Sequence, residues 1–129
     1  MLLAAFMVGA GALHFVIPRS YQRIVPRFLG HAPLLVAATG VAEIGAGVLL
    51  AVPATRRLGA WLSVVLLVVV WPANVQMALD GGLPGAGFPA GSAVVAWLRV
   101  PLQAPLVVWA LRQARRRVAS PPGSPLSAA

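Results

Sequence analysis

The 129-residue sequence contains no cysteine and no lysine, and only Glu43 and Asp80 carry side-chain carboxylates. Without cysteine, the chain cannot form disulfides, act through a thiolate or hold a metal or iron–sulfur cluster through sulfur. The two histidines and two carboxylates also lack the short helical spacings that bind metals, so we expect no metal site. Any redox role would therefore need a bound cofactor or a partner protein.

Positive charge comes from arginine alone, and the formal net charge is +8. The arginines stand in short segments beside apolar runs rather than across a soluble surface, which argues against nucleic acid as a partner. Anionic lipid headgroups suit this arrangement better. We therefore expect membrane lipids to be the partner.

Most of the chain is apolar, with 60% hydrophobic and 9% charged residues. A soluble domain of this length could not bury so large an apolar fraction in one core. A helix crosses a hydrocarbon layer of about 30 Å with about 20 residues, so the chain has room for about four crossings. The composition predicts an all-α fold, an integral membrane four-helix bundle.

Four apolar segments predict the crossings: residues 1–17, 33–52, 58–79 and 93–111. No arginine precedes the first segment and no clear cleavage site follows it, so we expect a retained helix rather than a signal peptide. The glycine- and proline-rich residues 80–92 predict a loop before the last helix. Pro101 and Pro105 predict a bend within that helix.

Residues 18–29 place Arg19, Arg23 and Arg27 on one side of a helix and apolar residues on the other. This pattern predicts an amphipathic interfacial helix between the first and second crossings, which Pro26 should kink or end.

The domain organisation that we predict is one membrane domain, residues 1–113, followed by a basic, Pro- and Ser-rich disordered tail, residues 114–129. More arginines flank the helix ends on the side of the termini than on the other side. This excess favours cytoplasmic N and C termini. The use of arginine without lysine, together with much Ala, Gly, Pro and Val, indicates a high-GC bacterial genome and therefore a bacterial inner membrane.

Five polar side chains fall inside the predicted crossings, where an ionisable group costs roughly 2.5 to 3.5 kcal/mol at the centre. They are His14, Glu43, Asn74, Arg99 and Gln103. Counting residues along each helix places all five in the half of the membrane away from the termini. Gly40 and Gly47 share a helix face with Glu43, so that carboxyl should point toward a neighbouring helix.

Two interpretations of this cluster stay open at the level of sequence. In the functional one, Glu43 and His14 exchange protons in a pocket whose other polar residues hold a polar headgroup. In the structural one, Arg99 neutralises Glu43 and the remaining side chains complete hydrogen bonds that hold the helices in register.

Several short stretches, in this order and spacing, resemble the DoxX-like family of small integral membrane proteins. They are Gly-Ala-Leu-His-Phe ending at Phe15, Ile-Val-Pro at 24–26, Gly-Val-Ala-Glu at 40–43, Pro-Ala-Asn-Val-Gln-Met-Ala at 72–78 and Arg-Val-Pro-Leu-Gln at 99–103. The resemblance covers about residues 9–110, and the five polar residues match the family's polar pattern.

This resemblance implies an accessory or scaffold subunit of a quinone-linked redox or oxidative-stress complex, without autonomous activity of its own. It implies redox partner proteins in the membrane and a quinone as the lipid-soluble ligand. Some redox-associated relatives have cysteine pairs, which this chain lacks, so a thiol-redox role is not expected. The alternatives are a small membrane enzyme that uses Glu43 and His14 for acid–base chemistry, or a small transporter.

Overall fold

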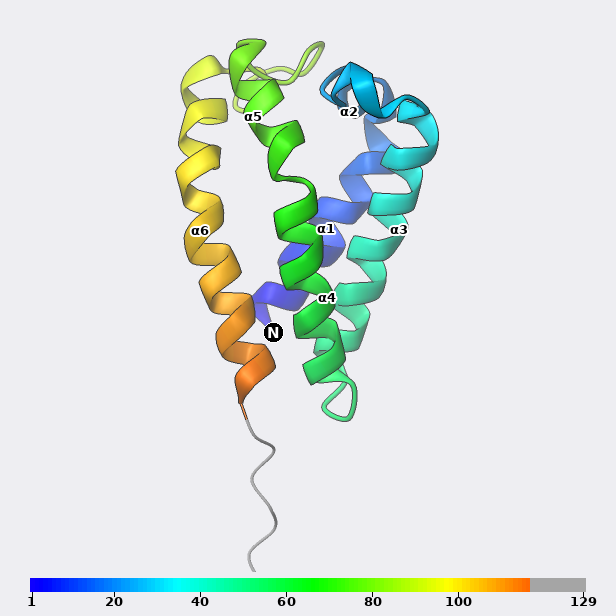
Figure 1. Ribbon diagram of the computed structural model, residues 1–129, viewed down its shortest axis with the longest axis vertical. Helices are drawn as coiled ribbons and strands as arrows, with labels where there is room; N and C mark the ends of the chain where they lie inside the picture. The colour runs from blue at the N-terminus through cyan, green and yellow to red at the C-terminus, as the bar shows by residue number, and fades with distance from the viewer. Residues whose placement is uncertain (117–129) are drawn as a thin grey trace, which may run out of the picture.

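The computed structural model describes residues 1–116, and its regular structure is helical throughout (Figure 1). The helices are α1 (Leu2–Val16), α2 (Pro18–Arg23), the 3-10 helix η1 (Arg27–Leu29), α3 (Ala32–Ala51), α4 (Arg56–Val69), α5 (Trp71–Leu79) and α6 (Ala93–Arg115). No strand occurs within the described residues, so the prediction of an all-α fold is confirmed there.

Three apolar segments are long enough to cross a membrane by length and composition: Ala32–Ala51, Arg56–Leu79 and Ala93–Arg115. The second of these comprises α4 and α5. Helix α1 is apolar as well, but its 15 residues extend for only about 22 Å. Residues 1–116 therefore contain three helical segments of full spanning length, where the sequence predicts four.

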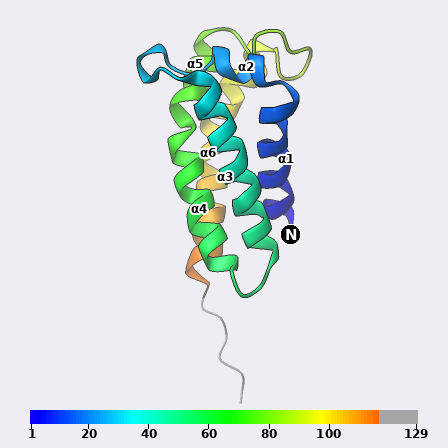
Figure 2. The same ribbon diagram turned by 90° about the vertical axis from the view of Figure 1, so that its right-hand side faces the viewer.

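The long helices pack in sequence along the chain, with α1 against α3, α3 against α4 and α4 against α6. Helix α2 and the loop of residues 80–92 lie at one end, and α6 finishes at the other (Figures 1 and 2). Helix α6 continues to Arg115, two residues into the segment predicted as a tail. Arg116 is the last described residue, and residues 117–129 of that predicted tail lie outside the described part of the chain.

Helices α1 and α3 approach each other closely because glycines occupy the contact. A Cβ atom on Gly40 would lie 2.8 Å from the Cβ of His14, and one on Gly11 would lie 2.6 Å from the carbonyl oxygen of Gly40. Side chains at either position would hold the two backbones apart. This contact places His14 beside the face of α3 that carries Glu43.

The predicted third crossing, residues 58–79, is interrupted at Val70, where α4 ends and α5 begins. Pro72 lacks an N–H group, so the helical bond to the carbonyl of residue 68 cannot form. Helix α4 packs against both α3 and α6, whereas α5 packs mainly against α6. The interruption thus separates α5 from α3. Helix α6, in contrast, continues through Pro101 and Pro105 without a break.

Helix α2 is shorter than the predicted segment 18–29, since it ends at Arg23 ahead of Pro26. Its apolar side does not face outward. Ile24, at its end, is buried in a cluster with Met77, Ala78, Leu83 and Ala96, and Tyr21 packs against the same cluster. The helix therefore covers one end of the protein, because the α5–α6 region offers it apolar surface.

Two apolar clusters divide the interior. The larger one joins α1, α3, α4 and α6 toward the end where α6 finishes, and it includes Met7, Ala46, Leu66 and Ala110. The smaller one lies beneath α2 and contains Ile24. Met7, Leu67 and Ile24 also line a cavity that lies between the two clusters.

Candidate functional site

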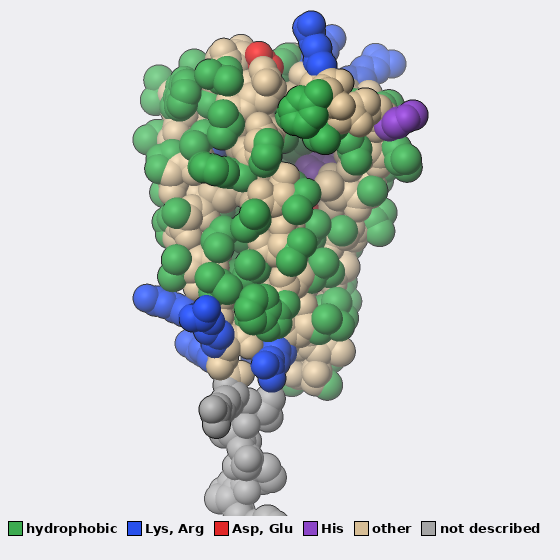
Figure 3. Space-filling view, in the orientation of Figure 1, with side chains coloured by type: hydrophobic (Ala, Val, Ile, Leu, Met, Phe, Trp, Pro, Cys, Tyr) green, Lys and Arg blue, Asp and Glu red, His purple; other side chains and the backbone are tan. Residues whose placement is uncertain are grey.

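A cavity of about 340 Å³ lies among all the helices of the described chain. Most of its lining is apolar, and its polar lining residues are His14, Tyr21, Thr39, Glu43, Asn74, Arg99 and Gln103. The structure thus brings all five polar residues singled out in the sequence to the walls of one cavity. Figure 3 shows a hollow among hydrophobic side chains in the upper half of the molecule, with a histidine visible inside. The cavity is therefore reached through an apolar side of the protein.

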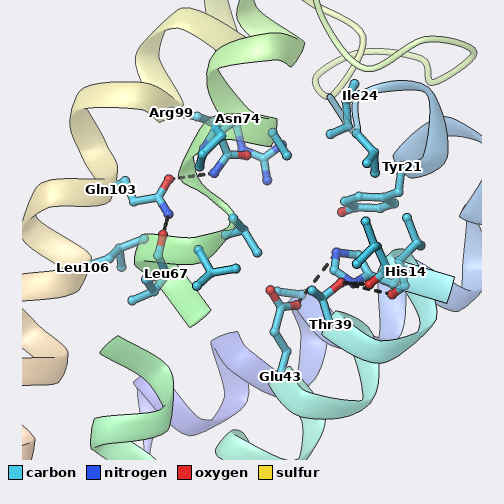
Figure 4. A pocket seen from close by; sticks show the side chains of 18 of the residues that line it. His14, Tyr21, Ile24, Thr39, Glu43, Leu67, Asn74, Arg99, Gln103 and Leu106 are labelled. Carbon is cyan, nitrogen blue, oxygen red and sulfur yellow. Dashed lines mark hydrogen bonds and ion pairs between the residues drawn. The ribbon is translucent and has the colours of Figure 1, made fainter. Parts of the chain in front are cut away.

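One side of the cavity, which we call the carboxyl wall, consists of His14, Thr39 and Glu43 (Figure 4). Glu43 is buried, and its Oε2 lies 3.9 Å from Nε2 of His14. That distance is too long for a hydrogen bond, and Oε2 has no other partner in the described structure. The carboxyl wall therefore contains a buried polar atom whose hydrogen bonding is incomplete.

Thr39 lies one helical turn before Glu43 on α3 and supports the histidine. Its Oγ1 donates to the carbonyl of Leu35 at 2.8 Å and lies 3.4 Å from Nδ1 of His14. A hydroxyl has a single proton, so donation to the backbone leaves its oxygen free to accept from the imidazole. This arrangement favours a proton on Nδ1 and an unprotonated Nε2 toward Glu43.

Tyr21 covers the carboxyl wall from α2. Its ring centroid lies 4.3 Å from that of His14, and the two rings meet edge to face at 68°. Burial raises the pKa of the Tyr21 hydroxyl, while the positive charge of Arg99 acts in the opposite direction. The hydroxyl therefore remains protonated at neutral pH and can donate a hydrogen bond within the cavity.

The opposite side of the cavity, which we call the amide wall, consists of Asn74, Arg99 and Gln103 (Figure 4). Asn74 Nδ2 donates to Gln103 Oε1 at 2.6 Å, and Gln103 Nε2 donates to the carbonyl of Leu67. These bonds connect α5 to α6 and α6 to α4. Interhelical amide bonds of this kind hold apolar helices together, so packing accounts for both side chains.

Arg99 differs from the two amides on its wall. It is exposed as a whole residue, although its side chain lines the cavity and its Nη1 lies 3.9 Å from the sulfur of Met77. Sulfur is a weak acceptor, so the guanidinium retains most of its capacity to donate. Arg99 can therefore hold a carbonyl or an anionic group of a bound molecule.

Arg99 does not neutralise Glu43 within residues 1–116. The carboxyl's ionisable neighbour there is His14. Figure 4 shows Glu43 and Arg99 on opposite sides of the cavity. The structural interpretation of the sequence is wrong on this contact, because the close approach of α1 and α3 brings the histidine to the carboxyl first.

Two cavity residues were missed in the sequence. Thr39 stands four residues before Glu43, so helical spacing places both on one face of α3 and could have identified it. Tyr21 falls by helical spacing on the apolar side of the predicted interfacial helix, opposite its arginines. No local pattern distinguishes an apolar side that faces lipid from one that covers a cavity.

The cavity walls offer donors and acceptors rather than a metal-binding set. Within residues 1–116, no group of three or more histidine, aspartate or glutamate side chains comes together. The polar groups on the two walls are instead spaced around a mostly apolar volume. Such a lining suits an organic molecule with a few polar atoms.

Comparison with known proteins yields one family. A family model described as a domain of unknown function (DUF8561) matches residues 3–114, a range that contains every polar residue of both walls. Neither the curated proteins nor the solved structures include a match to this chain.

Proposed function

Because the chain belongs to the DUF8561 family, a domain of unknown function, we propose its role from the cavity. We propose an integral membrane protein that binds a lipid-soluble molecule, such as a quinone, between the carboxyl wall and the amide wall. Four helices cross the membrane in this proposal: α1, α3, the α4–α5 pair and α6. The protein acts as an accessory or scaffold subunit of a membrane redox or oxidative-stress complex, as its resemblance to DoxX-like proteins implies.

The distribution of side chains supports the membrane placement. Figure 3 shows arginine side chains at both ends of the molecule, with a broad band of hydrophobic side chains between them. Large apolar residues are exposed along α3, α4 and α6; they include Leu34, Val41, Val65, Leu102 and Val108. Exposed apolar surface on this scale needs a lipid or protein partner. Helix α1, although short, can cross where the bilayer thins around it.

The termini face the cytoplasm of a bacterial cell in this proposal. Among residues 1–116, five arginines lie at the end of the molecule where α6 finishes: Arg56, Arg57, Arg112, Arg115 and Arg116. Three lie near the opposite end: Arg19, Arg23 and Arg27. Positive residues are retained preferentially on the cytoplasmic side. Their excess at the terminal end supports this orientation.

The observation that carries the ligand proposal is the buried Glu43 Oε2 without a hydrogen-bond partner. Leaving such an atom unsatisfied costs about 1 to 3 kcal/mol, and more if it is charged. A hydroxyl of a bound molecule, such as that of a reduced quinone, would donate the missing bond to Oε2, while the apolar lining would hold the rest of that molecule. Helix packing alone gives no comparable reason to retain a carboxyl at this position.

A quinone headgroup fits the chemistry of the two walls. Its two oxygens project from opposite sides of a ring, and the cavity offers polar groups on opposite sides. The Arg99 guanidinium can donate to one oxygen of the ring, and in the reduced form, the quinol, the hydroxyl on the opposite side can donate to Glu43 Oε2. The chain has no cysteine, so any electron transfer would belong to the quinone and to partner proteins.

The experiment that tests this proposal measures quinone retained by the full chain purified in an uncharged detergent. We expect the wild-type protein to retain quinone, and Glu43→Gln to retain at least about tenfold less, as the loss of one hydrogen bond to a charged group implies. Asp80→Asn is the matched control, because Asp80 is exposed and lies outside the cavity. Absence of quinone from the wild type, or equal retention by Glu43→Gln, would contradict the proposal.

A second candidate function is acid–base catalysis, which the 3.9 Å separation of His14 Nε2 and Glu43 Oε2 favours. A substrate C–H group beside a carbonyl, placed between these atoms, could give its proton to one of them and take a proton back from the other. The test incubates the purified protein in deuterated water and follows deuterium at carbon-bound positions of the molecule that copurifies with it. Incorporation by the wild type and its loss in Glu43→Gln would favour an enzyme, whereas no incorporation would exclude this chemistry for that molecule.

A further inference from the structure

A second cavity, of about 440 Å³, lies where the end of α1 and the start of α2 meet the loop between α5 and α6. Its lining includes Arg19, Ser20 and Arg23 from α2, Gly85 from the loop, and Val16 from α1. None of these residues lines the first cavity. This second cavity is therefore a separate site with a strongly basic character.

The polar groups of the second cavity converge on a common space. A Cβ atom on Gly85 would lie 3.6 Å from Ser20 Oγ and 3.9 Å from Arg23 Nη1. Because Gly85 has no side chain, that space stays open to another atom. Ser20 is only 8% exposed, so its side chain is enclosed by its neighbours while it lines the cavity.

Arg19 and Arg23 are one helical turn apart, so their positive charges repel each other. Neither arginine forms an ion pair within residues 1–116. The chain's two side-chain carboxylates lie elsewhere: Glu43 lines the first cavity, and Asp80 accepts a hydrogen bond from Gln76. A neutralising anion for this pair must therefore come from outside these residues.

A phosphate group satisfies all of these features. Its oxygens match the fork of donors on a guanidinium, and one oxygen can also accept from a serine hydroxyl. A single phosphate between Arg19 and Arg23 would replace their repulsion with two charge-assisted contacts. The Ser20 hydroxyl would supply a further hydrogen bond from below.

The surface beside the cavity indicates that the phosphate belongs to a lipid. Val16 is 71% exposed, and Ala12 and Val8 continue an exposed apolar stripe along α1 at one-turn intervals. A phospholipid with its phosphate in the cavity would place its acyl chains along this stripe. A free phosphate ion would leave the stripe uncovered.

We propose that the second cavity binds the headgroup of an anionic phospholipid, with Arg19, Arg23 and Ser20 holding its phosphate. This inference requires the membrane placement of the proposed function but not the quinone in the first cavity. The bound lipid would join α2 to the α5–α6 loop, and so would stabilise the cover over the first cavity.

The test uses native mass spectrometry of the full chain, released from uncharged micelles that contain either phosphatidylglycerol or phosphatidylcholine. We expect the wild type to retain one phosphatidylglycerol molecule in preference to phosphatidylcholine. Arg19→Gln/Arg23→Gln should lower this retention at least about tenfold, since each basic residue contributes about 1 kcal/mol toward anionic lipid. Arg112→Gln/Arg115→Gln, at the other end of the molecule, is the matched control and should retain the lipid.

Ser20→Ala provides a second variant that leaves both charges in place, and it should lower retention severalfold. Equal losses in the control pair would show general surface attraction and overturn the proposal. Displacement of the lipid by millimolar inorganic phosphate would assign the cavity to free phosphate instead. Glu43→Gln should lose quinone but keep phosphatidylglycerol, so failure of either proposal can be recognised separately.

Discussion

The two walls of the first cavity carry similar numbers of polar groups but differ in how fully those groups are bonded. On the amide wall, Asn74 donates to Gln103, and Gln103 donates to the carbonyl of Leu67, so three helices are joined in one chain of bonds. On the carboxyl wall, Glu43 Oε2 is buried without a partner, and His14 remains 3.9 Å away. Polar residues at similar depth can therefore have different reasons to be there.

This difference distinguishes side chains that hold the helices together from side chains that are available to bind a ligand. Removal of the amides should loosen the helices, because their bonds are made within the protein. Removal of the Glu43 carboxyl should abolish the cost of burying an atom without a hydrogen bond, and should leave the packing of the helices intact. Matched substitutions on the two walls should consequently change stability in opposite directions.

The largest effect is expected at the contact that supports the carboxyl wall. Gly40→Ala would place a Cβ 2.8 Å from both the Cβ of His14 and the ring of Phe15, and should destabilise the protein by about 2 to 3 kcal/mol. Gly45→Ala, on the same helix with open space around it, should be neutral or stabilising. Thermal unfolding in detergent, followed by circular dichroism, measures both. Similar midpoints for the two variants would contradict the close contact of α1 and α3.

On the amide wall, Gln103→Leu should lower the free energy of unfolding by about 1 to 2 kcal/mol, because two interhelical bonds are lost. Gln76→Leu is the control, since the Gln76 bond to Asp80 is exposed and should contribute under about 0.5 kcal/mol. Asn74→Leu/Gln103→Leu should cost less than the sum of the single changes, as expected for residues in one network. Strict additivity would mean that the network is not formed.

On the carboxyl wall, Glu43→Leu should raise the free energy of unfolding by about 1 kcal/mol, because it removes a buried polar atom that has no partner. The same variant should lose the bound quinone. Unfolding and quinone retention measured on one preparation test both statements. A loss of stability similar to that of Gln103→Leu would place Glu43 in the structural network after all.

The smallest effect is expected for Thr39→Val, which keeps the shape of the side chain. Its hydroxyl donates to a backbone carbonyl of its own helix, so stability should change by less than about 0.5 kcal/mol. Loss of the 3.4 Å approach to His14 should lower quinone retention by less than about threefold. A loss as large as that of Glu43→Gln would show that the tautomer of His14 controls binding.

Much of the local structure could be predicted from the sequence. The apolar segments locate the long helices, the run of glycine and proline from residue 80 to 92 locates the loop, and Pro72 indicates a disturbance close to the observed interruption at Val70. These predictions depend on spacing and backbone chemistry within a few residues. The sequence also predicts that Pro26 kinks or ends the segment 18–29, and α2 ends at Arg23, ahead of that proline.

The sequence alone therefore determined an all-helical chain with five polar side chains at similar depth in its apolar segments. Only the tertiary structure decided that His14 rather than Arg99 lies beside Glu43, and that Tyr21 faces the cavity. Depth follows from counting along one helix, because each residue adds a constant rise. Which side chains meet across two helices depends on the rotation of each helix about its axis and on the distance between the helices. That geometry arises from contacts such as Gly11 against Gly40, which spacing within a single helix does not specify.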